Sequence, residues 1–281
     1  MSWFMAILMG FVQGLTEFIP VSSSGHLALL QSFGLENIHD RHIFFDVMLH
    51  MGTLVAVIVV YRRDIIEMIR ATLSLFRGNR GGSGAHPIEP SKARLAFMLI
   101  LATLPLAIAI PFVRIVGALG NHMWFVGLML LVTGGFLYYS DKLEIGRRTE
   151  KNMTIKDAGV IGLLQATVGV LPGISRSGIT ITGGLMTGLD RKFAVRFSFL
   201  MSIPAILGAY IVTFFTSMSD VDWSLMPRYL VGVLVAGVTG FFAIHLVKIL
   251  VDAGKFGKFA YYCWGLGAAV IVTSIVQGIM R

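Results

Sequence analysis

Long apolar stretches separated by short polar ones make up most of the chain. Six of them are long enough to cross a bilayer as helices, because the hydrocarbon core takes about 20 helical residues. They cover roughly residues 43–61, 94–112, 123–140, 195–217, 228–250 and 260–280. The pattern therefore predicts an all-α polytopic membrane protein with six full transmembrane helices.

Two further apolar stretches have a different pattern. Residues 3–34 and 158–189 are apolar at both ends and are interrupted in the middle by Pro, Gly and Ser. Such residues break a helix, and broken helices occur at membrane depth where they are buried in protein or line a cavity. We expect each stretch to be a re-entrant segment of two half-helices.

The basic residues predict the orientation, because loops rich in Lys and Arg stay in the cytoplasm. The basic loops are 62–94, 141–157 and 190–196. By contrast, 113–122 has a single Arg, and 218–227 has two Asp and no base, so we place these two loops outside. The segment 3–34 then enters from the outer face, and 158–189 enters from the cytoplasm.

The two re-entrant segments also resemble each other. "QGLTEFIPVSSSG" from Gln13 and "QATVGVLPGISRSG" from Gln165 share the Gln, a Pro seven residues later and a final Ser-Gly. With the opposite directions of entry and the three crossings between them, the likeness indicates two inverted-topology repeats, 1–140 and 141–281, in one membrane domain. Broken helices of such repeats meet near the midplane, so we expect their tips to face each other.

Composition excludes a soluble enzyme, because 56% of the 281 residues are hydrophobic and only 14% are charged. The single Cys263 leaves no disulfide framework. No Lys or Arg precedes Arg41, so the positive region of a signal peptide is missing and the first stretch is expected in the mature fold. The net charge of +8 follows from the basic cytoplasmic loops, and a nucleic-acid partner is not expected.

The first tip carries residues suited to chemistry. Gln13 and Glu17 are four apart and share one helix face. A carboxylate within the membrane is costly unless it pairs or binds a cation. Ser23 follows as a candidate hydroxyl nucleophile, and His26 can move a proton near neutral pH.

The second tip, "PGISRSGIT", suits an anion. Arg176 is flanked by Ser175 and Ser177, with Thr180 one turn later, and a guanidinium with backbone amides forms a phosphate site. Two alternatives stay open. Glu17 and Arg176 could form a structural salt bridge across the repeat axis, and hydroxyls such as that of Thr180 often bond their own helix backbone. Two more residues, Asp46 and His50, either extend the site or face the headgroups.

These two motifs closely resemble the paired signatures of the bacterial undecaprenyl-pyrophosphate phosphatase family linked to bacitracin resistance. The resemblance extends to chain length, spacing and segment pattern. It implies a multi-pass enzyme of the inner membrane that releases the terminal phosphate of undecaprenyl pyrophosphate, which renews the lipid carrier for peptidoglycan. It also implies a divalent cation, Mg²⁺ or Ca²⁺, an active site that opens toward the outer face, and a homodimer.

Carried over by position, the resemblance gives four residues catalytic roles. Ser23 matches the nucleophile, His26 the proton-transferring residue, and Arg176 the phosphate-binding arginine, with Ser175, Ser177 and Thr180 in the same phosphate site. Glu17 matches the acidic residue, which would hold the cation together with Gln13. Gln13 stands where many relatives have a second Glu, so one charged ligand is missing.

A function of another class is also consistent with the pattern. Inverted repeats whose broken helices meet at the midplane are a transporter architecture. The phosphate-binding tips would then serve translocation of undecaprenyl phosphate as a flippase. Hydrolysis without transport, or transport without hydrolysis, separates the two.

Overall fold

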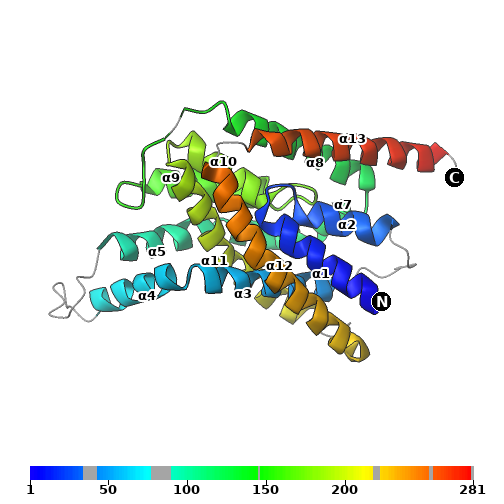
Figure 1. The fold of residues 1–281 in the computed structure, drawn as a ribbon, viewed down its shortest axis with the longest axis horizontal. Helices are drawn as coiled ribbons and strands as arrows, with labels where there is room; N and C mark the ends of the chain where they lie inside the picture. The colour runs from blue at the N-terminus through cyan, green and yellow to red at the C-terminus, as the bar shows by residue number, and fades with distance from the viewer. Residues whose placement is uncertain (34–42, 77–89, 145, 218–221, 253–255, 280–281) are drawn as a thin grey trace.

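The computed structural model describes residues 1–33, 43–76, 90–144, 146–217, 222–252 and 256–279. Within these ranges the regular structure is helical, apart from one isolated bridge between Arg148 and Leu189. The helices run mainly along the long axis of the molecule, and both chain ends lie toward the same end of that axis (Figure 1). The expectation of an all-α fold is confirmed.

Five described helical segments are long and apolar enough to cross a membrane, and a bent pair brings the number to six. The five are Pro90–Phe112, Met123–Ser140, Arg191–Thr213, Trp223–Val251 and Gly257–Ile279. They belong to α5 (Pro90–Thr103) with α6 (Leu106–Ala109) and η1 (Ile110–Phe112), α8 (Met123–Ser140), α11 (Arg191–Ser217), η3 (Trp223–Leu225) with α12 (Met226–Asp252), and α13 (Gly257–Ile279). The sixth predicted crossing is α3 (Ile43–Val60). A short α7 (Val113–Leu119) precedes α8. The protein is therefore a multi-pass membrane protein.

The first re-entrant segment forms α1 (Trp3–Phe18) and α2 (Ser23–Phe33), which pack against each other so that the chain turns back on itself (Figure 1). Ser2 caps α1 by accepting a hydrogen bond from the backbone of Met5. The helix ends because Pro20 restricts the residue before it, and Ile19 is extended with φ −66° and ψ 129°. The predicted break lies between the two helices.

The second re-entrant segment forms α9 (Ile155–Thr167) and α10 (Arg176–Met186). A capping box between Thr154 and Asp157 starts α9. The break contains Gly173 at φ +95°, a conformation that side chains with a Cβ rarely adopt. Ser175 then caps α10 by accepting from the amide of Gly178.

One helix lies where the sequence indicated only a basic loop. α4 (Arg62–Phe76) follows α3 after a bend of 77°. It is amphipathic: Met68 and Ala71 are buried against the protein, whereas Arg63, Glu67 and Arg70 are exposed. Charge alone had assigned this segment to a loop, but apolar residues three and four apart give it a helical stripe.

Glycines let helix backbones approach closely. α1 packs on α12 at Gly10, where an added Cβ would lie 2.4 Å from the carbonyl oxygen of Gly232. α8 packs on α13, where a Cβ at Gly267 would lie 2.7 Å from the carbonyl oxygen of Gly127. Small residues at such crossings are how membrane helices gain packing contacts.

The division into the repeats 1–140 and 141–281 stays a prediction. α1 of the first half packs on α12 of the second half, and α9 of the second half packs on α5 of the first half. Two related halves would produce such corresponding contacts. α8 and α13, the last helix of each half, pack on each other.

Candidate active site

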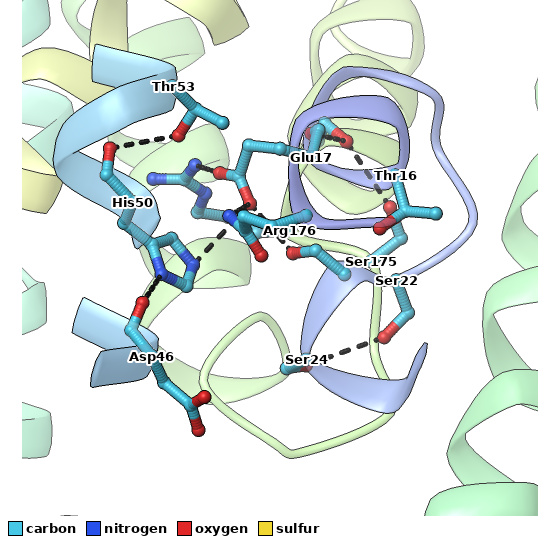
Figure 2. A network of polar contacts seen from close by, with 12 residues as sticks. Thr16, Glu17, Ser22, Ser24, Asp46, His50, Thr53, Ser175 and Arg176 are labelled. Atoms are coloured by element: carbon cyan, nitrogen blue, oxygen red, sulfur yellow. Dashed lines mark hydrogen bonds and ion pairs between the residues drawn. The ribbon is translucent and has the colours of Figure 1, made fainter. Parts of the chain in front are cut away.

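The tips of the two re-entrant segments meet at Glu17 and Arg176 (Figure 2). Glu17 lies in the last turn of α1 and is only 6% exposed, and Arg176 is the first residue of α10. The guanidinium Nη2 donates to the carboxylate Oε1, and the Ser177 hydroxyl donates to the backbone carbonyl of Glu17 at 3.3 Å. The tips therefore face each other as expected, and the ion pair considered from the sequence is present.

The other carboxylate oxygen of Glu17 is also surrounded by polar groups. Its Oε2 accepts from Nε2 of Gln13 at 3.0 Å and from the Ser23 hydroxyl at 2.7 Å. Nε2 of His50 lies 3.5 Å away. These partners compensate for the cost of placing a carboxylate inside the membrane.

His50 thus extends the site rather than facing the headgroups (Figure 2). Its Nδ1 lies 2.7 Å from the backbone oxygen of Asp46, which directs Nε2 toward Glu17. The Asp46 carboxylate accepts from Nε2 of Gln31 at 2.9 and 3.1 Å, so it binds α3 to α2. In the sequence, only the spacing of four residues between Asp46 and His50 pointed to this part of the site. The contact of His50 with Glu17 became visible only in the folded structure.

The turn before α2 has a constrained backbone. Ser22 has φ +73°, and its hydroxyl accepts from the amide of Gly25 at 3.1 Å. A Cβ at Gly25 would lie 3.0 Å from that hydroxyl and 3.3 Å from Cα of Gly173, so any larger residue would press the two tips apart by a few tenths of an ångström. Ser24 accepts from the amide of Gly173 at 3.4 Å, which joins the first tip to the second.

Ser23 and His26 are three apart on α2 and so lie on the same side of that helix. The Ser23 hydroxyl donates to Glu17, whereas the imidazole of His26 contacts the backbone oxygen of Ser22 and the hydroxyl of Tyr262, each at 2.7 Å. The proton-transfer role of His26 stays a prediction. Tyr262 was not foreseen as a partner, because nothing local marks a contact 236 residues away.

The remaining hydroxyls of the second tip shape the start of α10. Ser175 is its cap, and the Ser175 amide donates to Thr133 at 3.0 Å. Thr180 bonds the backbone oxygen of Arg176 at 2.9 Å and the hydroxyl of Ser198 at 2.7 Å. Thr180 therefore bonds its own helix backbone, which was one of the alternatives left open. Ser175 and Thr180 are each 2% exposed, and direct contacts of these residues with phosphate stay a prediction.

Comparison with known proteins identifies the family. A family model described as "Bacitracin resistance protein BacA" matches residues 6–269. The chain belongs to this family. Three similar relatives are each named undecaprenyl-diphosphatase: one from Alkaliphilus metalliredigens, 38% identical over 98% of this chain and 100% of the relative; one from Methanobrevibacter smithii, 40% identical over 97% and 98%; and one from Syntrophotalea carbinolica, 40% identical over 98% and 100%.

In this BacA-family chain, the residues at the first tip fit a hard cation. Oε1 of Gln13 is buried and has no hydrogen-bond partner, and it belongs to the side chain that also donates to Glu17. Oxygen ligands of this kind suit Mg²⁺ and Ca²⁺. Among the described residues, no three His, Cys, Asp or Glu side chains are grouped to hold a metal. Mg²⁺ often takes only one or two protein ligands and completes its shell with phosphate and water.

Proposed function

We propose that this protein is an undecaprenyl-diphosphatase, which hydrolyses undecaprenyl diphosphate to undecaprenyl phosphate and inorganic phosphate. The observation that carries the proposal is the meeting of Glu17, Ser23 and Arg176 at the tips of two broken helices in a membrane protein. Relatives of that name match the chain along almost its full length. The reaction renews the carrier lipid for peptidoglycan and other envelope polymers, and it supports resistance to bacitracin.

Arg176 binds the terminal phosphate in this proposal. Its planar guanidinium matches the oxygens of a phosphate as well as those of a carboxylate. In the structure the guanidinium is bound by the Glu17 carboxylate, so an incoming phosphate replaces that carboxylate at the guanidinium. Arg176 also opens an 11-residue helix, whose N-terminal amides favour an anion. Ser175 and Ser177 contribute by fixing this turn, and Thr180 contributes by fixing the next.

Ser23 either attacks phosphorus or orients the attacking water. Its hydroxyl proton is directed at Oε2 of Glu17 across 2.7 Å, so that carboxylate receives the proton as the attacking oxygen bonds to phosphorus and the P–O bond to the leaving lipid phosphate breaks. The lipid phosphate leaves as an anion. Where Ser23 is the nucleophile, His26, on the same side of α2, takes a proton at Nε2 from the water that then cleaves the phosphoserine, and Glu17 returns its proton to Ser23. Mg²⁺ or Ca²⁺, held by Gln13 and Glu17, would neutralise charge on the phosphates.

The proposal also includes a location and an assembly. We place the protein in the inner membrane with its site open toward the outer face, because the first tip enters from the side opposite the basic loops. The exposed side chain of Ser24 lies beside that tip. A homodimer is expected from the family resemblance, and cross-linking in native membranes tests it.

Phosphate release from undecaprenyl diphosphate tests the function directly. Purified protein in detergent is assayed with Mg²⁺, with Ca²⁺ and with chelator, beside Glu17→Gln and Ser23→Ala. We expect the parent to release phosphate only when a cation is present. In each variant the rate of release should fall by at least about a hundredfold, which is the effect of removing one preorganised catalytic group. Glu67→Gln, whose side chain is 53% exposed, is the matched control and should keep the parent rate. A folded parent that binds the lipid and releases nothing would reject hydrolysis and favour the flippase.

A further inference from the structure

Tyr262 of α13 reaches across to His26 of α2. Its hydroxyl lies 2.7 Å from Nε2 of the imidazole. The two rings are also stacked, with centroids 5.7 Å apart and an interplanar angle of 5°. The contact joins the first re-entrant segment to the last transmembrane helix, so the site draws on residues from both ends of the chain.

The two hydrogen bonds of His26 fix its tautomer. The backbone oxygen of Ser22, 2.7 Å from Nδ1, can only accept, so Nδ1 carries the hydrogen. Nε2 of the neutral ring is then an acceptor, and the hydroxyl of Tyr262 donates to it. Ser22 holds this oxygen in place through a left-handed backbone, φ +73°. Both ring nitrogens are therefore oriented before substrate arrives.

Exposure increases from the ion pair toward Tyr262. Glu17 is buried, Ser23 and His26 are partly buried, and Tyr262 is 48% exposed. The tyrosine therefore lies at the exposed rim of the site. A group at this place can hold the imidazole and still give way to a phosphate.

We propose that Tyr262 is a positioning residue for the phosphatase reaction, which holds His26 by its Nε2 atom in the tautomer and ring orientation that proton transfer needs. The inference rests on the proposed role of His26. Tyr262 acts through that imidazole and carries no bond-making step of its own.

The neighbouring tyrosine is a matched control. Tyr261 is 65% exposed and packs edge-on against Trp264, and its ring faces a different side of α13. The position of α13 does not depend on either hydroxyl. Trp264 donates to the backbone oxygen of Leu131 at 3.1 Å, and Gly267 lies against Gly127. Removing one hydroxyl from Tyr262 thus leaves the helix where it is.

The test compares Tyr262→Phe, Tyr261→Phe, His26→Ala and the double variant His26→Ala/Tyr262→Phe. Each purified full-length protein is assayed for kcat and KM with undecaprenyl diphosphate, and the His26 ring nitrogens are observed by ¹⁵N NMR. We expect Tyr262→Phe to lower kcat about tenfold with little change in KM, the size of coupling typical of hydrogen-bonded neighbours. Its His26 nitrogens should show mixed tautomers. The double variant should be no slower than His26→Ala.

Three outcomes overturn the inference and are distinguishable. If His26→Ala is slow but Tyr262→Phe matches Tyr261→Phe in rate and in ¹⁵N shifts, Tyr262 does not position His26, and the proposed function stands. If the losses of the two single variants multiply in the double variant, the tyrosine acts independently. A fully active His26→Ala protein would reject the role of His26 in the proposed function and the inference with it.

Discussion

Arg176 and Glu17 form an ion pair, although 159 positions separate them along the chain. Each lies at the broken end of a helix from a different re-entrant segment, α10 and α1. Neither charge is left unpaired inside the membrane, and a substrate phosphate can replace the carboxylate at the guanidinium. The pair is therefore a structural link, and in the proposed function it is also the place where the substrate phosphate competes with the carboxylate.

Replacing Arg176 by lysine should reduce phosphate release strongly. Lysine keeps the charge but lacks the planar fork that binds phosphate at two points. We expect a loss of about 10² to 10³ in kcat, as for other preorganised charge-stabilising groups. Arg191→Lys is the control, because Arg191 pairs with Asp141 at 3.1 Å outside the site. Equal rates for the two lysine variants would contradict a phosphate-binding role.

Replacing Gln13 by glutamate should tighten cation binding. The change puts a second carboxylate beside Glu17, four residues along the same helix, and ligand charge raises the affinity for Mg²⁺ and Ca²⁺. The cation concentration that gives half-maximal phosphate release should then be lower than in the parent. The increase in melting temperature on adding either cation should also be larger, because a ligand that binds the folded state stabilises it.

Gln31→Glu tests whether added charge alone has this effect. Gln31 is also buried and hydrogen-bonded to a carboxylate, that of Asp46. We expect its cation requirement to equal that of the parent. An unchanged requirement in Gln13→Glu as well would remove Gln13 from the cation site.

Replacing Gly52 by alanine should destabilise the fold. A Cβ at this position would lie 2.2 Å from the carbonyl oxygen of Val233, so α3 and α12 must move apart. Overpacking of this kind costs about 1–3 kcal/mol. Thermal unfolding in detergent measures it. Gly265→Ala is the control, because its Cβ would enter open space on α13, and alanine is the better helix former. A Gly52→Ala protein as stable as the control would contradict the close packing.

The outer-face placement of the site predicts which residues a membrane-impermeant maleimide reaches in intact cells. In a Cys263→Ala background, Ser24→Cys should be labelled from outside, because Ser24 is exposed beside the first tip. Asn152→Cys, in the basic loop before α9, should be labelled only after the cells are opened. The reverse pattern would invert the proposed topology.

Several features of the fold were predictable from the sequence. The stretch 123–140 is α8 with the same bounds, and both re-entrant segments break where Pro, Gly and Ser interrupt them. The ion pair of Glu17 and Arg176 was one of the alternatives left open, because a charge inside the membrane needs a partner and few are available. These are local properties: crossing a bilayer requires a certain length of apolar helix, and a break requires particular residues.

The tertiary structure alone decided which further side chains meet around this ion pair. His50 reaches Glu17, and Tyr262 reaches His26, because glycine-mediated packing sets how α3 lies against α12 and how α13 lies against α8. Such contacts depend on helix rotation and on distances across the bundle, which no periodicity along the chain encodes. The sequence by itself determined the number of membrane segments and the candidate chemistry of the two tips. The packing of the segments determined which groups orient the carboxylate and the imidazole.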